Sequence, residues 1–326
     1  MCGICGVRRF GEEPITPEQI RILLVGNERR GIQATGIATQ QMDGSVQVWK
    51  MDEPAGRAVM DPGFQEFLDG NLKEDTLCVL GHTRAATKGA TVYPRNNHPM
   101  WDEKVAVVHN GVIHNDDFLF NDLKLTRVAE TDSDIFRAIL SSEGFTRKGI
   151  TTLNRVVGSA AIAAVSTEHP GKLLLARSGN PIVLCATENH LIWSSEKQPI
   201  YDALRPFYKK WGIWMRKMKV DCGFNNMPND TAWLIGDEPR KDQVGDDTWV
   251  EWHNIFKVAN YFTAAKYDVH NSYNARWSND HRGKKAVVIR CTNVKCKCWL
   301  ELSPEMRGNL EKLRCEQCGV MLKRAE

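Results

Sequence analysis

The sequence predicts an α+β fold, in which helices cover a layered sandwich of mostly antiparallel strands, followed by a small cysteine-rich module. Two observations predict this fold. Short apolar segments bounded by turn residues recur as far as Ile235, with a few helix-start signals between them. After about Glu238 the apolar pattern weakens, and paired cysteines appear near the end of the chain. The 326 residues, 42% of them hydrophobic, are enough for a sizeable core.

Helix-start signals and turn residues place the individual elements. Thr16 and Gln19 have the spacing of a capping box, with Pro17 at the first helical position, and Thr131 or Asp132 is expected to cap a later helix. The expected helices span residues 17–30, 64–68 and, opening within 130–134, up to 140, while residues 206–219 have mixed helix and strand character. The expected strands span residues 4–9, 37–41, 46–50, 76–83, 105–108, 160–166, 173–176, 182–186, 191–194 and 231–235.

Polar residues follow two of these strands. Gly81-His-Thr-Arg84 ends one apolar strand, and His109-Asn-Gly111 ends the next. A site assembled from the ends of neighbouring strands needs side chains of this kind there.

Charge is unevenly distributed along a chain whose net charge is only +3. From Arg205 onward there are 22 Lys and Arg against 15 Asp and Glu, and seven of the ten Trp lie in the same part. Basic residues interleaved with aromatic ones are typical of nucleic-acid surfaces, although a solvated surface above core aromatics has the same composition.

The ten cysteines follow no apolar signal segment, which favours catalytic, metal-binding and buried thiols over disulfides. Cys5, Cys78 and Cys185 are expected to be buried. The apolar segment 158–165 is too short to cross a bilayer, so we expect no contact with a membrane and a cytoplasmic protein.

The second residue is the candidate nucleophile. Loss of Met1, which the small Cys2 side chain favours, would leave a thiol and a free α-amine on one residue. An amine with a pKa of about 7.7 to 8.0 can act as the base for that thiol. The alternative is that Cys2 is a small apolar residue at an arbitrary start.

Seven segments in order resemble class II glutamine amidotransferases, which are N-terminal-nucleophile hydrolases. The resemblance runs from Cys2 to about Gly236 and is closest to the glutaminase domain of glucosamine-6-phosphate synthases. It implies a four-layer αββα sandwich over residues 2–238. The segments are Cys2-Gly-Ile-Cys-Gly6, Arg30-Gly-Ile-Gln-Ala-Thr-Gly36, Gly81-His-Thr-Arg-Ala-Ala-Thr87, Asn97-His-Pro99, Val107-Val-His-Asn-Gly111, Glu130-Thr-Asp132 and Ala176-Arg-Ser-Gly-Asn-Pro181.

The catalytic roles that the resemblance implies suit the residue types. The Cys2 thiolate would attack the side-chain amide of L-glutamine, with its own amine as base and no cofactor. The Asn110 side chain and the Gly111 N–H would hold the oxyanion. Asn110-Gly111 could instead be only a turn.

The substrate-binding roles also follow from the resemblance. Arg84 would bind the α-carboxylate of glutamine and Asp132 its α-ammonium, with Thr87 and His98 as further substrate-binding residues. The alternatives are a surface salt bridge for Arg84 and a helix cap for Asp132.

Three positions depart from the pattern of the resembling enzymes. Ala85 stands where they usually have Trp, Lys88 where they have His, and Gln33 where an Asp often follows Arg-Gly-x. The sugar-isomerase half of a glucosamine-6-phosphate synthase has no counterpart in the sequence. We therefore expect an acceptor or synthase protein as the partner of this chain.

The closing segment, residues 286–326, resembles a zinc ribbon. The spacing Cys291-x4-Cys296-x-Cys298, then Cys315-x2-Cys318, suits a tetrahedral structural zinc. We expect Cys291, Cys296, Cys315 and Cys318 as ligands, with Cys298 as the alternative to either of the first two. Residues 239–285 would be a basic, Trp-rich linker.

The sequence therefore predicts a glutaminase that forms glutamate and ammonia, with the ammonia delivered to an acceptor on a separate protein. The C-terminal region would dock a protein or nucleic acid. Two alternatives remain open: a non-catalytic nucleic-acid-binding or scaffold protein with the same fold, and a glutamine–fructose-6-phosphate aminotransferase that works with a partner subunit.

Overall fold

The computed structural model describes residues 1–187, 189–205 and 225–236, together with four later strands. The chain divides into two compact units, Met1–Ile255 and Phe256–Glu326. The first unit contains two antiparallel sheets, and the second contains a three-stranded antiparallel sheet of β14 (Ala275–Asn279), β15 (Lys285–Arg290) and β16 (Trp299–Leu302).

The N-terminus lies in the middle of the first sheet. Its strands are, in spatial order, β11 (Asn225–Asn226), β9 (Val183–Ala186), β10 (His190–Ser194), β1 (Gly3–Arg9), β4 (Thr76–Arg84), β2 (Ala34–Gln41) and β3 (Val46–Met51). Because β1 pairs with β10 on one side and β4 on the other, the residue that precedes it is held at the end of a central strand. β1 is buried on both faces, which explains its nearly continuous apolar sequence.

The second sheet has the order β13 (Val250–Asn254), β12 (Thr231–Ile235), β8 (His169–Ser178), β7 (Gly158–Ser166), β6 (Val105–Ile113) and β5 (Met100–Trp101). Within it, β6 pairs antiparallel with β7 across the connection that contains α4, α5 and α6, and β7 pairs with β8 in a hairpin. The pairing of β12 with β13 carries this sheet beyond residue 238, where the sequence predicted a linker to begin. β14 also lies within that expected linker.

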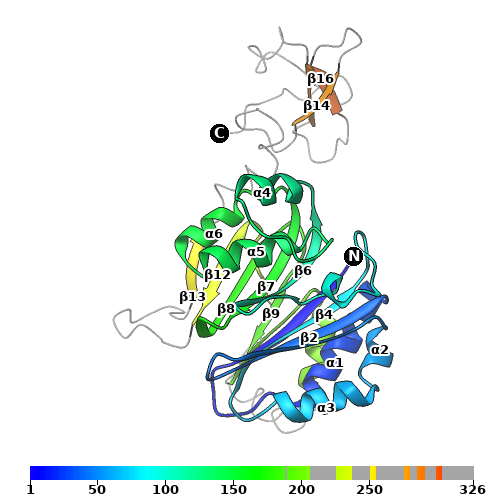
Figure 1. The fold of residues 1–326 in the computed structure, drawn as a ribbon, viewed down its shortest axis with the longest axis vertical. Coiled ribbons are helices and arrows are strands. Elements are labelled where there is room, and N and C mark those ends of the chain that lie inside the picture. The colour runs from blue at the N-terminus through cyan, green and yellow to red at the C-terminus, as the bar shows by residue number, and fades with distance from the viewer. Residues whose placement is uncertain are drawn as a thin grey trace. The chain divides into compact units, whose positions relative to one another are not determined.

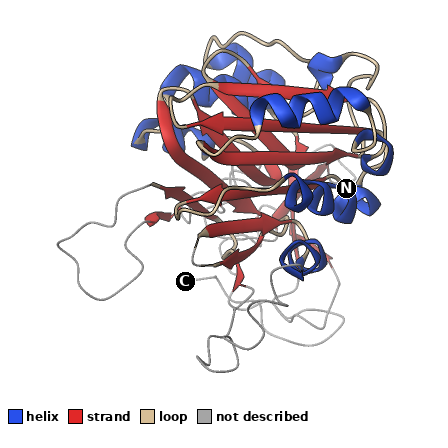
Figure 2. Cartoon of the chain, turned by 90° about the horizontal axis from the view of Figure 1, so that it is seen from below, coloured by secondary structure: helices blue, strands red, loops and turns tan. Residues whose placement is uncertain are grey.

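The helices lie outside the two sheets, as Figures 1 and 2 show. The helices are α1 (Pro17–Asn27), α2 (Ala55–Ala58), α3 (Pro62–Asn71), α4 (Asp116–Asp122), α5 (Asp134–Glu143) and α6 (Arg147–Leu153), with short 3-10 turns at Glu28–Arg30 and Pro94–Asn96. Residues 197–205 are also helical.

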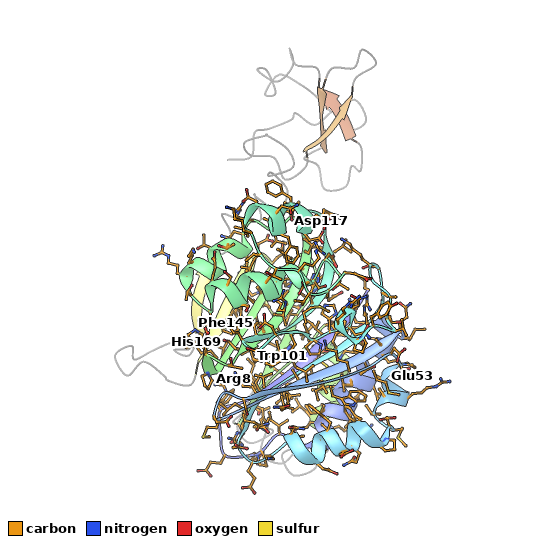
Figure 3. The ribbon with its side chains drawn as sticks, viewed as in Figure 1. Arg8, Glu53, Trp101, Asp117, Phe145 and His169 are labelled. Carbon is orange, nitrogen blue, oxygen red and sulfur yellow. The ribbon has the colours of Figure 1, made fainter. Side chains whose placement is uncertain are left out.

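Two apolar interfaces hold these layers together. Between the sheets, Ile4 and Leu80 of the first pack in one cluster with Val108 and Leu175 of the second, and Trp101 packs against its edge (Figure 3). On the outer face of the first sheet, α1 and α3 bury a separate apolar cluster against β1 and β4. On the second sheet, α5 lies against β5 and β6. The described part of the first unit is therefore an αββα sandwich.

The start of α1 confirms the predicted capping box. The Thr16 hydroxyl accepts from the Gln19 N–H at 3.2 Å, and the Gln19 side chain accepts from the Thr16 N–H at 2.9 Å, with Pro17 at the first helical position. These bonds satisfy N–H groups that have no partner within the helix.

The predicted cap of α5 was wrong. The N-cap residue of this helix is Ser133, without a side-chain cap bond. The Asp132 carboxylate instead accepts the Ile113 N–H at 2.6 Å, and Thr131 contacts Met100. The Asp132 side chain thus binds the backbone at the end of β6 and does not cap the helix that follows it.

Several predictions fall on residues that the structure does not describe. These are the mixed segment 206–219 and the cysteines expected to bind zinc, Cys291, Cys296, Cys315 and Cys318, with Cys298. In the described residues, no helix is long and apolar enough to cross a membrane.

Candidate active site

Cys2 lies at the entry to β1, with its thiol against the residue that follows β4. The Sγ atom accepts from the Ala85 N–H at 3.3 Å and lies 3.5 Å from the Ala85 carbonyl oxygen. The Cys2 carbonyl accepts from Nε of Arg30 at 2.9 Å, and Arg30 in turn contacts Glu196 at 3.1 Å. The backbone of the second residue is therefore fixed by an ion-paired side chain as well as by the sheet.

Burial raises the pKa of the Cys2 thiol above its ordinary value. The Ala85 N–H, the positive N-terminus and Arg84 oppose this shift, and Asp132 adds to it. A thiol in this state is protonated at neutral pH, so it needs a base before it can attack. Arg84 directly precedes Ala85, whose N–H binds the thiol, and the charges of Arg84 and Asp132 act on the thiol pKa in opposite directions.

Arg84, the last residue of β4, is buried at 2% exposure, which excludes a surface salt bridge. Its Nη1 donates to Oδ1 of Asn97 at 2.6 Å, and its Nη2 donates to the carbonyl oxygens of Lys88 at 2.7 Å and Gly89 at 2.8 Å. Three of its five N–H donors are thus used within the described residues. Two have no partner in that part of the chain.

Asn110 and Gly111 lie inside β6, which continues to Ile113, so the prediction that the strand ends before them was wrong, as was the alternative of a turn. Both polar atoms of the Asn110 side chain are buried without a hydrogen-bond partner in the described structure. An unpaired buried amide is costly, and such groups are often paired only when a ligand binds.

Gly111 has a φ of +156° and is crowded by the neighbouring strand. A Cβ atom there would lie 1.9 Å from the carbonyl oxygen of Ser159. The close approach of β7 to β6 therefore requires glycine at this position.

Sequence reasoning missed Asn180, which supports the Asn110 backbone. Its side-chain amide donates to the Asn110 carbonyl at 3.0 Å and to the Ser159 hydroxyl at 3.2 Å. The preceding Gly179 N–H is bound by the side chain of Asn229. The motif that contains Asn180 was recognised, but only the tertiary structure brings it to β6.

The two remaining predicted substrate-binding residues differ in their surroundings. Thr87 is exposed on the loop after β4. His98 is buried and stacks on His82 with ring centroids 4.0 Å apart. Burial lowers the pKa of His98 well below its ordinary value, so its ring is neutral and suited to packing rather than to proton transfer.

Gln33 takes a defined place in the site. Its side-chain oxygen accepts from the Ala86 N–H at 2.6 Å, and its own N–H donates to the Arg84 carbonyl at 3.0 Å. An amide oxygen therefore fixes the loop directly after Arg84. Across the described residues there is no group of three or more His, Cys, Asp or Glu that could hold a metal.

The chain is similar to known proteins in both sequence and fold. Residues 82–202 match the family described as a glutamine amidotransferase domain. The chain is 33% identical over 229 residues to an isomerizing glutamine–fructose-6-phosphate aminotransferase of Gluconobacter oxydans, a match that covers 66% of this chain and 35% of that protein. It is 33% identical over 199 residues to the aminotransferase of the same name from Rhizobium meliloti. The chain spans about a third of the length of these relatives.

The fold is also similar to that of solved structures. A glutamine phosphoribosylpyrophosphate amidotransferase from B. subtilis superimposes with a TM-score of 0.53 at 16% identity, over 78% of this chain and 49% of the other. A structure described as the allosteric regulatory enzyme of purine biosynthesis gives a TM-score of 0.55 at 17% identity, with the same coverage. The matched domain and the relatives support an enzyme of the class II glutamine amidotransferase type, and the solved structures show that the fold is shared.

Proposed function

We propose that the chain hydrolyses L-glutamine to glutamate and ammonia at Cys2. The observation that carries the proposal is the convergence of a partly buried thiol, an arginine with free N–H donors and a buried carboxylate. The Cys2 thiol binds the N–H of Ala85, the residue after Arg84, and the charge of Asp132 acts on both Cys2 and Arg84. This set matches the reacting amide, the α-carboxylate and the α-ammonium of a free amino acid.

In the proposed mechanism, removal of Met1 frees the Cys2 amine. The amine takes the thiol proton, the thiolate attacks the side-chain carbonyl of glutamine, and the proton is returned to the departing ammonia. Water then releases glutamate from the thioester. The raised pKa of the thiol supports this route, because a protonated thiol depends on a nearby base.

The side chain of Asn110 and the Gly111 N–H would stabilise the oxyanion that forms in both steps. The unpartnered amide of Asn110 supports this role. The neutral, buried His98 would support the substrate site by packing, and Thr87 would contact the substrate from the loop after β4. The ammonia would pass to an acceptor on a separate protein.

A matched pair of cysteine variants tests the proposal. Cys2→Ala should lose ammonia release from glutamine by at least about 10³-fold, as expected for removal of a nucleophile. Cys5→Ala, three residues further along, removes a fully buried thiol whose pKa burial raises to about 12, and should keep turnover within about threefold.

Intact mass is measured on the same samples. We expect Met1 to be absent and activity to rise with the fraction of chains that lack it. A fully processed protein that leaves glutamine untouched would contradict the proposed function and favour the binding or scaffold alternative. The zinc site and the nucleic-acid surface stay predictions from the sequence, because their residues lie largely outside the described part of the chain.

A further inference from the structure

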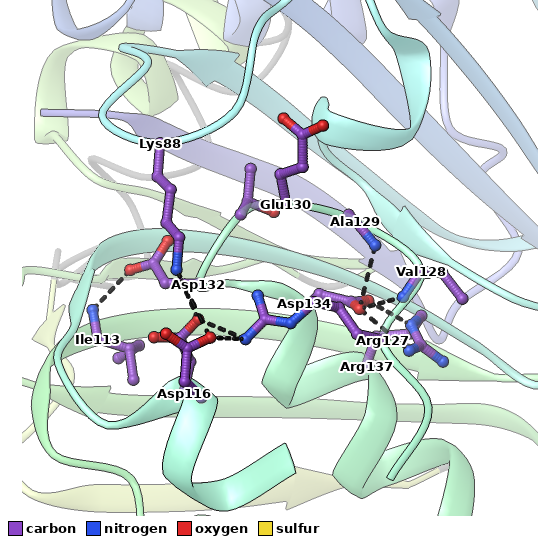
Figure 4. A network of polar contacts seen from close by, with 12 residues as sticks. Lys88, Ile113, Asp116, Arg127, Val128, Ala129, Glu130, Asp132, Asp134 and Arg137 are labelled. Carbon is purple, nitrogen blue, oxygen red and sulfur yellow. Dashed lines mark hydrogen bonds and ion pairs between the residues drawn. The ribbon is translucent and has the colours of Figure 1, made fainter. Parts of the chain in front are cut away.

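Lys88 joins the site to a helix that plays no part in the proposed reaction. Its carbonyl oxygen accepts from Nη2 of Arg84 at 2.7 Å. Its ammonium lies 3.1 Å from Oδ2 of Asp116 on α4 (Figure 4). One residue thus links the proposed carboxylate-binding arginine to an ion pair on another element.

Asp116, the acidic partner in this ion pair, is buried and is held by a second basic residue. The Asp116 side chain is 6% exposed, and the same Oδ2 atom accepts from Arg127 at 2.8 Å. Burial alone would raise the pKa of Asp116, but the hydrogen bonds from Arg127 and Lys88 outweigh it and hold the pKa below its ordinary value. The neighbouring Asp117, which is 77% exposed, also binds Arg127.

The loop between Arg84 and η2 (Pro94–Asn96) has other attachments, which lie before and after Lys88 and Gly89. Before them, the Ala86 N–H donates to the Gln33 side chain at 2.6 Å. The Asn96 amide donates to the Ala90 carbonyl and to Glu130, and the Asn97 amide donates to the Thr91 carbonyl. The carbonyls of Lys88 and Gly89 both accept from Arg84. This part of the loop is attached to a neighbouring element through the ion pair between Lys88 and Asp116.

We propose that Lys88 is a positioning residue for recognition of the substrate α-carboxylate. The ion pair with Asp116 holds the loop, the loop presents its carbonyls to Nη2 of Arg84, and this orients the two free N–H donors of Arg84 toward the carboxylate. The inference rests on the proposed glutaminase function. It assigns a task to the lysine that stands where the resembling enzymes have histidine.

The test compares two substrates on four proteins. Ammonia release is measured from L-glutamine and from its methyl ester, which lacks the charged α-carboxylate, with wild type, Lys88→Met, Lys88→Arg and Lys148→Met. Lys148 is the matched control, because its ammonium also binds a largely buried carboxylate, that of Glu143 at 3.3 Å. Lys88→Met should fold, since Arg127 still neutralises Asp116.

We expect Lys88→Met to raise KM for glutamine about three- to tenfold, with kcat nearly unchanged and the kinetics of the ester unaffected. Lys88→Arg should restore the wild-type KM, and Lys148→Met should match wild type. An unchanged KM in Lys88→Met, or an equal loss with both substrates, would overturn the proposal.

Hydrogen exchange separates this inference from the proposed function. If wild type shows no glutamine turnover, the proposed function fails, and exchange at residues 85–90 then decides whether Lys88 positions the loop. Faster exchange in Lys88→Met than in wild type and Lys148→Met supports the positioning role. Equal exchange in the three proteins overturns it.

Discussion

At the residue scale, two buried asparagines show how a side chain assigned to catalysis differs from one assigned to structure. Asn27 donates to the Leu23 carbonyl at 2.8 Å and to Ser194 at 2.9 Å, so its amide holds α1 to β10. Asn110 is equally buried, but its amide atoms have no partner within the described residues. Folding gains nothing from the Asn110 amide, which suits a group whose partner is an oxyanion.

This contrast gives a prediction for a pair of alanine variants. Asn110→Ala should lower kcat for glutamine by about 10² to 10³ while the urea midpoint changes little. Asn27→Ala should lower the free energy of unfolding by about 2 kcal/mol because it leaves buried groups unpaired. Turnover and urea denaturation are measured on both variants. Asn110→Ala with kcat within about threefold of wild type would exclude the proposed role.

At the element scale, the start of α5 is fastened by a buried ionic cluster (Figure 4). Arg137 binds the Asp134 carboxylate at 2.5 Å and that of Asp102 at 2.6 Å, and donates to the Thr126 carbonyl. Asp134 also accepts the Val128 N–H at 2.7 Å. The cluster therefore fixes the segment from residue 126 to α5, and with it the proposed substrate ligand Asp132.

Removal of this arginine should be costly. We expect Arg137→Met to lower the free energy of unfolding by about 3 kcal/mol, because Asp134 would remain buried without its cation. The exposed pair Arg155–Asp122, at 2.5 Å, provides the control, and Arg155→Met should cost less than about 1 kcal/mol. Urea denaturation measures both. Equal small losses would mean that the buried cluster contributes no more than a surface ion pair.

At the scale of the whole molecule, histidines join the two sheets. His82 of the first sheet donates from Nε2 to the carbonyl of His109 of the second at 3.0 Å, and His98 stacks on His82. Burial lowers the pKa of His82 to about 3 and also lowers those of His98 and His109. All three rings are therefore neutral in the folded protein at neutral pH.

The sign of the pH effect follows from these lowered values. Between the folded pKa and the unfolded value of about 6.5, the unfolded chain binds more protons, so stability falls as pH falls. His82, with a folded pKa of about 3, should remove about 2 kcal/mol between pH 7 and pH 5, and His98 and His109 should shift the stability in the same direction. The urea midpoint should drop over this range, and less steeply in His82→Gln. A midpoint that is constant from pH 7 to pH 5 would contradict the neutral cluster.

The sequence by itself determined much of the first unit. Short apolar segments bounded by turn residues predicted the positions of strands such as β1, β7 and β12, and a capping box predicted the start of α1, because these signals are local. The buried thiols expected at Cys5, Cys78 and Cys185 are confirmed. Motifs in order also predicted the domain family, since each motif constrains backbone and chemistry together.

Only the tertiary structure decided which motif residues meet. Asp132 looked like a helix cap because its neighbours in the sequence suit one, whereas its carboxylate binds β6. Asn110 and Gly111 looked like the end of a strand or a turn, yet pairing with β7 continues the strand through them. The contacts of Asn180 with Asn110 and of Lys88 with Asp116 join residues 70 and 28 positions apart. Long-range packing sets such contacts, and no local pattern records them.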